Sequence, residues 1–124
     1  CTGNKKKGSL PDKVQIKDFK DLAVWQKSKA LTLEFYNVAR KFPAFEEFIL
    51  KSQLIRASSS VMGNIAEGNG QTYTGLNQYK YMNSALGSTS EVRCWIDLAK
   101  ELGYITVAEY KDFEDKAQEI IRMQ

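Results

Sequence analysis

The sequence predicts an all-α protein, an antiparallel up-down-up-down four-helix bundle with a flexible basic N-terminal tail. Three observations support this fold class. The 124 residues include only two prolines, Pro11 and Pro43. Four stretches with the apolar periodicity of α-helices follow one another. The connections between them are short, which makes successive helices antiparallel neighbours. A chain of this length suits one domain, so we expect a tail over residues 1–18 and a bundle over residues 19–124.

The first twenty residues hold the basic excess of the chain. Six lysines oppose Asp12 and Asp18 there, a net charge of +4, whereas the other 104 residues carry twelve basic and thirteen acidic groups. A lysine cluster flanked by Gly, Ser, Thr and Asn is typical of a disordered arm. Such an arm either contacts phosphates without sequence preference or is simply a solvated tail.

The first helix is expected over residues 21–41, because Pro43 disfavours a helical conformation at the residue before it. Its apolar residues form two sectors, with Lys27, Glu34 and Lys41 in a gap between them. One sector contains Leu22, Trp25, Ala30, Leu33 and Tyr36, and the other contains Val24, Leu31, Phe35, Val38 and Phe42. A surface helix in a monomer needs one stripe. Two stripes favour a second chain on one face, although a helix buried within its own domain gives the same pattern.

The second helix is expected over residues 44–67, ending where Gly68 and Gly70 supply a left-handed turn. Opposite its apolar side runs a line of polar residues within a sector of about 80°: Gln53, Arg56, Ser60, Asn64 and Glu67. One interpretation is a structural polar network that fixes helix register, formed by Gln53, Arg56, Asn64, Glu67 and Glu91. The alternative is that these groups line a pore or groove of an oligomer and contact a partner.

The third helix is expected to begin between residues 72 and 76 and to end near Leu102. The small residues at positions 87–90 indicate the close approach of a neighbouring helix. Gly103 then predicts a C-terminal stop. Thr106 with Glu109 three residues later forms a capping box for the last helix.

The residue types of the chain argue against a catalytic or metal-binding site. The chain has no histidine, which excludes histidine-based triads and ordinary zinc or di-iron sites. Glu67 with Glu91 would be a thin ligand set for a hard cation, so we expect no cofactor, no metal and no enzymatic activity.

Of the two cysteines, Cys94 is expected to pack as a small hydrophobic residue. Cys1, at a start without methionine, indicates either a trimmed chain or a cleavage such as that of a bacterial lipoprotein.

Five segments resemble the four-helix bundle family that is named after the 23S rRNA intervening-sequence protein. They are FKDLAVWQKSKAL at 19–31, KFP at 41–43, QLIRASSSVMGNIAEGNG at 53–70, SALGSTSEV at 84–92 and LAKELGYI at 98–105. Together they span nearly the whole chain after residue 18. The motif NIAEG with the later LGYI is the most specific part of this resemblance.

The resemblance implies a small, non-enzymatic, cytoplasmic bacterial protein that forms a ring-like homopentamer. Some members of the family are encoded inside an rRNA intervening sequence. The chain is also similar to accessory proteins of diversity-generating retroelements, which implies nucleic acid and a reverse transcriptase as partners and no membrane.

We therefore predict a self-assembling accessory or scaffold protein that binds RNA or DNA through basic surfaces. A purely protein-binding oligomeric scaffold is the alternative. The candidate nucleic-acid contacts are the basic residues of the tail and first helix: Lys5, Lys6, Lys7, Lys13, Lys17, Lys20, Lys27, Lys29, Arg40 and Lys41. In an oligomer each of these groups would be repeated, which strengthens the summed field.

Overall fold

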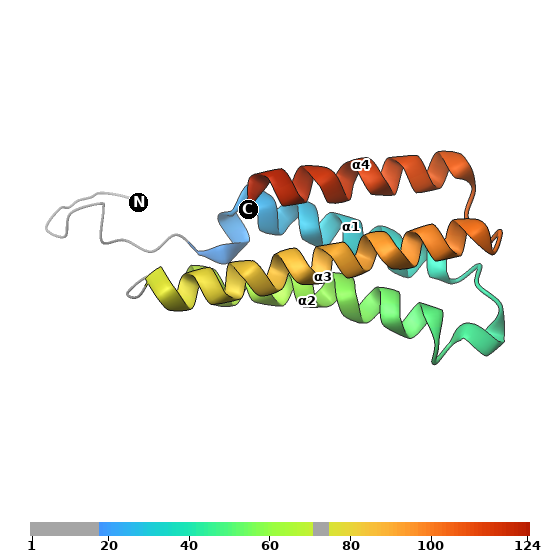
Figure 1. The fold of residues 1–124 in the computed structure, drawn as a ribbon, viewed down its shortest axis with the longest axis horizontal. Coiled ribbons are helices and arrows are strands. Elements are labelled where there is room, and N and C mark those ends of the chain that lie inside the picture. The colour runs from blue at the N-terminus through green and yellow to red at the C-terminus, as the bar shows by residue number, and fades with distance from the viewer. Residues whose placement is uncertain (1–17, 71–74) are drawn as a thin grey trace, which may run out of the picture.

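A computed structural model describes residues 18–70 and 75–124 of the chain. These ranges contain helices and no strands, arranged as an antiparallel four-helix bundle (Figure 1). The helices are α1 (Ala23–Ala39), α2 (Leu50–Gly70), α3 (Gly75–Glu101) and α4 (Val107–Met123), with short 3₁₀ helices η2 (Phe19–Asp21) and η3 (Ala44–Glu46). The all-α prediction is confirmed. The predicted tail, apart from Asp18, lies outside the described residues.

Each helix packs against its neighbours in sequence order, and α4 closes the bundle by returning to α1. The core contains one apolar stripe from every helix, and its largest fully buried side chains include Phe35, Leu54, Ile65, Ile96 and Ile120. The Phe35 and Phe113 rings meet edge to face with their centroids 4.9 Å apart, which joins α1 to α4. The sector of α1 with Leu31, Phe35 and Val38 therefore faces this core.

Buried hydroxyl groups lie within this core. Ser28, Thr32 and Thr89 each donate a hydrogen bond to the carbonyl four residues earlier, and Ser58 donates to Ile55. Each of these hydroxyl donors thus has a partner within its own helix, and Thr32 also lies 3.4 Å from the Ser58 carbonyl of α2, so burial leaves none of them without a partner.

The second helix begins later than expected. Residues 44–46 form η3 and α2 starts at Leu50, where the buried Glu46 carboxylate accepts a hydrogen bond from the Leu50 backbone N–H at 3.2 Å. This satisfies one of the free donors of the first helical turn. The prediction that the helix starts at Ala44 was wrong, because apolar periodicity does not distinguish a 3₁₀ turn from the start of an α-helix.

The end of α2 also differs from the prediction. The helix continues through Gly68 to Gly70, and in the described residues only Gly103 has a positive φ among the glycines. Gly68 is instead a contact point with α3, since a Cβ built there would lie 3.3 Å from Met82 Cε. The glycine thus permits a close approach of two helices rather than a left-handed turn.

The connection from α3 to α4 follows the prediction. Gly103 has φ 81°, and its N–H donates to the Lys100 carbonyl while the Tyr104 N–H donates to Ala99. This pair of bonds is a Schellman motif, which ends α3. Thr106 and Glu109 then exchange hydrogen bonds between side chain and backbone, so the predicted capping box of α4 is confirmed.

Candidate nucleic-acid interface

One flank of α1 is joined to α4 by three ion pairs. Lys27 lies 3.4 Å from Glu119, Glu34 lies 2.8 Å from Lys116, and Lys41 lies 2.9 Å from Glu109. The ammonium of Lys116 also pairs with Asp112, and its hydrogen bonds to Glu34 and then Asp112 raise its pKa. Lys27 and Lys41 were predicted as nucleic-acid contacts, yet in this structure carboxylates neutralise both.

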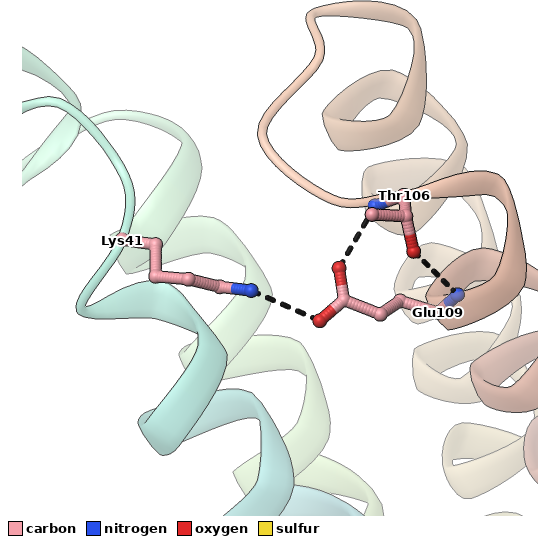
Figure 2. A network of polar contacts seen from close by, with 3 residues as sticks. All are labelled: Lys41, Thr106 and Glu109. Atoms are coloured by element: carbon pink, nitrogen blue, oxygen red, sulfur yellow. Dashed lines mark hydrogen bonds and ion pairs between the residues drawn. The ribbon is translucent and has the colours of Figure 1, made fainter.

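Figure 2 shows how Lys41 joins the cap of α4. One Glu109 oxygen accepts from the Thr106 backbone N–H at 2.8 Å, and the other accepts from Lys41 Nζ at 2.9 Å. The Thr106 hydroxyl in turn accepts from the Glu109 N–H at 3.0 Å. The backbone bond, followed by the bond from Lys41, lowers the pKa of Glu109. The carboxylate is therefore held in its charged form at the helix N-terminus.

The other flank of α1 presents cations that have no carboxylate partner. Lys20, Lys29 and Arg40 are exposed and form no ion pair in the part of the chain that the structure describes. Lys29 Nζ lies 5.6 Å from the centre of the Trp25 ring, a cation–π contact. The basic residues on and beside α1 thus divide into Lys27 and Lys41, which pair with α4, and Lys20, Lys29 and Arg40, which form no ion pair in the described ranges. Arg40 lines a depression beside α2 and also one that contains Glu109 and Asp112 of α4.

Between α1 and α2 the surface is hollowed into two adjoining depressions that share Tyr36, here called the α1–α2 groove. The first, of about 460 Å³, is lined by Trp25, Lys29, Thr32, Leu33, Tyr36, Ser59, Met62 and Gly63. The second, of about 510 Å³, is lined by Tyr36, Arg40, Glu47, Phe48, Lys51, Ser52, Ile55 and Arg56. Three residues of the first apolar sector of α1 line this groove: Trp25, which also packs against the core, and the exposed Leu33 and Tyr36.

The members of the polar line of α2 differ in their contacts. Ser60 and Ser88 hydroxyls are 2.9 Å apart, and the Asn64 amide donates to the Ser60 carbonyl at 2.9 Å. The remaining members of the predicted network are exposed and make no side-chain hydrogen bond or ion pair within residues 18–70 and 75–124: Gln53, Arg56, Glu67 and Glu91. In this chain, therefore, a pair of neutral hydroxyls links α2 to α3, and Arg56 lines the α1–α2 groove.

The sequence did not predict one polar contact, which joins the connection between α1 and α2 to the connection between α3 and α4. Tyr104 Oη donates to Glu46 at 2.8 Å across 58 residues of chain, and partial burial together with this bond raises the pKa of Tyr104. Nothing local marks Glu46 as buried, because it lies among exposed residues of the connection after α1.

A surface of exposed apolar side chains was also missed. Phe45, Ile49, Leu98, Leu102 and Val107 are each at least 40 % exposed. All lie near the end of the bundle where α1 and α3 end and α2 and α4 begin (Figure 1). We call this set the apolar end. Phe45 near Pro43 was a signal for it, since an aromatic residue in a helix connection is not required by the core.

Two predictions about α3 need correction. Cys94 is exposed rather than packed, because the buried positions of α3 (85, 89, 92, 96 and 99) lie on the opposite side of the helix. Gly87 is exposed as well, with nothing within 4 Å of an added Cβ, so packing inside this chain does not explain it. Of the small residues there, Ser88 contacts α2 and Thr89 is buried.

Other features bear on the class of site. Within the described ranges, no three Cys, Asp or Glu side chains gather as a metal-binding group, and no helix is long and apolar enough to cross a membrane. Five of the predicted nucleic-acid contacts lie outside the described residues: Lys5, Lys6, Lys7, Lys13 and Lys17.

Comparisons with known proteins agree with this fold. A family model described as the 23S rRNA-intervening sequence protein matches residues 20–124. A crystal structure of a protein with unknown function from the S23 ribosomal protein family of Bacteroides thetaiotaomicron is similar, with a TM-score of 0.73 and 24 % identity over 82 % of this chain and 94 % of that one. A search of curated proteins found no match.

Proposed function

Because the chain belongs to the 23S rRNA-intervening sequence protein family, we propose that it is a non-enzymatic, self-assembling protein that binds nucleic acid as an accessory or scaffold factor. The observation that carries this proposal is the division of the cations on α1 and on the segments directly before and after it. Lys27 and Lys41 are paired with α4, whereas Lys20, Lys29 and Arg40 have no carboxylate partner in the described ranges. When unpaired lysine and arginine side chains neutralise phosphates, the counterions condensed on the nucleic acid are released, and this release drives association.

Five further lysines lie in the sequence before residue 18, next to the start of the bundle. The segment that contains them joins the bundle at Phe19, whose ring packs edge to face against Trp25 at 5.0 Å. The five lysines before residue 18 therefore connect to the bundle at the Trp25 end of the α1–α2 groove. Copies of the chain in an assembly, such as the homopentamer that the family resemblance implies, would repeat all these charges and strengthen the field on a polyanion.

Protein partners belong to the same proposal. The apolar end exposes five large apolar side chains, and large apolar side chains gathered at one end of a molecule favour protein–protein contacts there. We place contacts between copies there, and also the contact with the reverse transcriptase that the resemblance to retroelement accessory proteins implies.

The test is binding of labelled RNA and DNA over a salt series. We expect affinity at low salt that falls steeply as salt rises, and a shallower dependence after Lys5, Lys6 and Lys7 are replaced by glutamine. Replacement of Lys111 and Arg122 on α4, which are exposed, is the matched control. Absence of binding at low salt would refute the nucleic-acid function.

The apolar end also favours a second candidate, a purely protein-binding oligomeric scaffold. Its large exposed side chains explain an assembly without any contribution from the cations. This candidate predicts stable oligomers together with no salt-dependent affinity for RNA or DNA, so the same titration separates the two.

A further inference from the structure

The α1–α2 groove combines unpaired cations with accessible rings along one path. From Trp25 to Arg40 the groove follows fifteen residues of α1, about 22 Å at the rise of an α-helix. Trp25 is half-buried, Tyr36 is 50 % exposed, and Phe48 is 89 % exposed. Lys29 lies beside the first ring, and Arg40 and Arg56 line the part that contains the other two. Positive charge and aromatic surface therefore alternate along the groove.

The charge of the groove is not cancelled from within. Its only acidic lining residue is Glu47, and Lys51 already pairs with this carboxylate at 2.9 Å. Lys29, Arg40 and Arg56 have no ion-pair partner among the residues the structure describes. A ligand that fills the groove must therefore bring negative charge of its own.

A polyanion longer than the groove fits better than an acidic helix or a second copy. In the sequence, five lysines precede Phe19, whose ring packs against Trp25 of the groove, and a short acidic helix has no charges to spare for them. Lysine is also depleted in the centres of protein–protein interfaces. Phosphates repeated along a chain meet both sets of cations.

The exposed aromatic rings indicate which kind of polyanion the groove binds. Aromatic side chains on a basic groove stack on the bases of single strands, whatever their sequence. In a duplex the base faces are covered by neighbouring bases, so Tyr36 and Phe48 gain nothing from it. We infer that the α1–α2 groove binds single-stranded nucleic acid, an assignment that rests on the proposed function. Lys29, Arg40 and Arg56 meet phosphates, and Tyr36 and Phe48 stack on bases.

The experiment measures fluorescence anisotropy of the full chain with a labelled oligothymidine strand and with a duplex of equal length. We expect the single strand to bind more tightly. Phe48→Ala should weaken its binding roughly 5- to 150-fold, the value of one stacked base. The matched control is Tyr79→Ala, which removes an exposed ring of α3 that belongs neither to the groove nor to the apolar end and should leave the affinity within about two-fold.

A second pair of variants tests the phosphate contacts. Arg56→Gln should weaken binding and reduce the slope of affinity against salt by about 0.7, whereas Arg122→Gln on α4 should leave the slope unchanged. Circular dichroism and urea unfolding check that each variant folds, which is expected because these side chains are exposed.

The outcomes are distinguishable. Equal binding of both nucleic acids, with no effect of Phe48→Ala, would overturn the single-strand inference and leave the proposed function standing. No binding to either at low salt would refute the proposed function itself. If Phe48→Ala and Arg56→Gln change the oligomeric state but not nucleic-acid affinity, the groove is an interface between copies and the inference fails.

Discussion

Single residues hold the ends of the helices in this bundle, and Thr106 is the clearest example. Its hydroxyl accepts from Glu109 while Glu109 accepts from the Thr106 backbone and from Lys41. Thr106→Ala should lower the free energy of unfolding by about 0.5–2 kcal/mol, measured by urea unfolding at neutral pH. Thr106→Ser keeps the hydroxyl, so a loss as large as that of alanine would contradict the capping role.

The same residues predict an acid dependence. The pKa of Glu109 is lowered in the folded chain, so the unfolded chain binds this proton more readily. The stabilisation is complete above the unfolded pKa, about 4.3, and is lost as pH falls through the folded value. Unfolding followed from pH 6 to pH 3 should therefore depend less on pH in Glu109→Gln than in the parent. Glutamine still serves a capping box, which makes it a conservative control, and identical pH curves would contradict the shift.

The close packing of α2 against α3 can be tested with two glycines of α2. A Cβ added to the exposed Gly63 would meet open space, whereas one added to Gly68 would lie 3.3 Å from Met82 Cε. Gly63→Ala should raise the free energy of unfolding by about 0.5–1 kcal/mol, and Gly68→Ala should gain less. Gly68→Leu should destabilise by about 1–3 kcal/mol because it forces α2 and α3 apart. Thermal and urea unfolding measure all three, and equal gains from the two alanines would argue against the close approach.

How far the sequence predicts each element depends on whether the deciding interaction is local. The Schellman turn at Gly103 and the capping box at Thr106 involve residues within five positions of one another, and both were predictable. The start of α2 depends on Glu46, whose burial is fixed by Tyr104 far along the chain. Periodicity placed Cys94 in an apolar stretch, but the rotation of α3 about its axis, set by α2 and α4, leaves it exposed.

The candidate site shows the same limit. Sequence identified the cations of α1 and the apolar sector with Trp25, Leu33 and Tyr36. It did not show that Lys27 and Lys41 face carboxylates of α4, because that pairing needs the closed bundle. Arg56 was assigned to a network with Glu67 or Glu91, yet its side chain lines the α1–α2 groove.

At the scale of the whole molecule, the apolar end predicts how copies associate. Replacing Leu98 and Leu102 together by glutamate places two charges on this surface, and charge is depleted in interface centres. Size-exclusion chromatography with light scattering should then report a smaller species than the parent chain. Met123→Glu, at the opposite end of the bundle, is the control. An unchanged mass would show that the apolar end does not join copies, and a monomeric parent would refute self-assembly.

The ion pairs between α1 and α4 have a consequence for how the chain reaches one fold. Along α1 and the turn after it, the charges of Lys27, Glu34 and Lys41 are positive, negative and positive, seven residues apart. Each pairs with a residue of α4 of the opposite charge. If α4 slid by two turns in the direction that brings Glu109 opposite Glu34, Lys116 would come opposite Lys27. Each exposed pair adds little stability, but the pattern penalises this misaligned bundle, whose apolar stripes would still meet. The three ion pairs therefore favour one register of α4 against α1 among several that hydrophobic burial alone would permit.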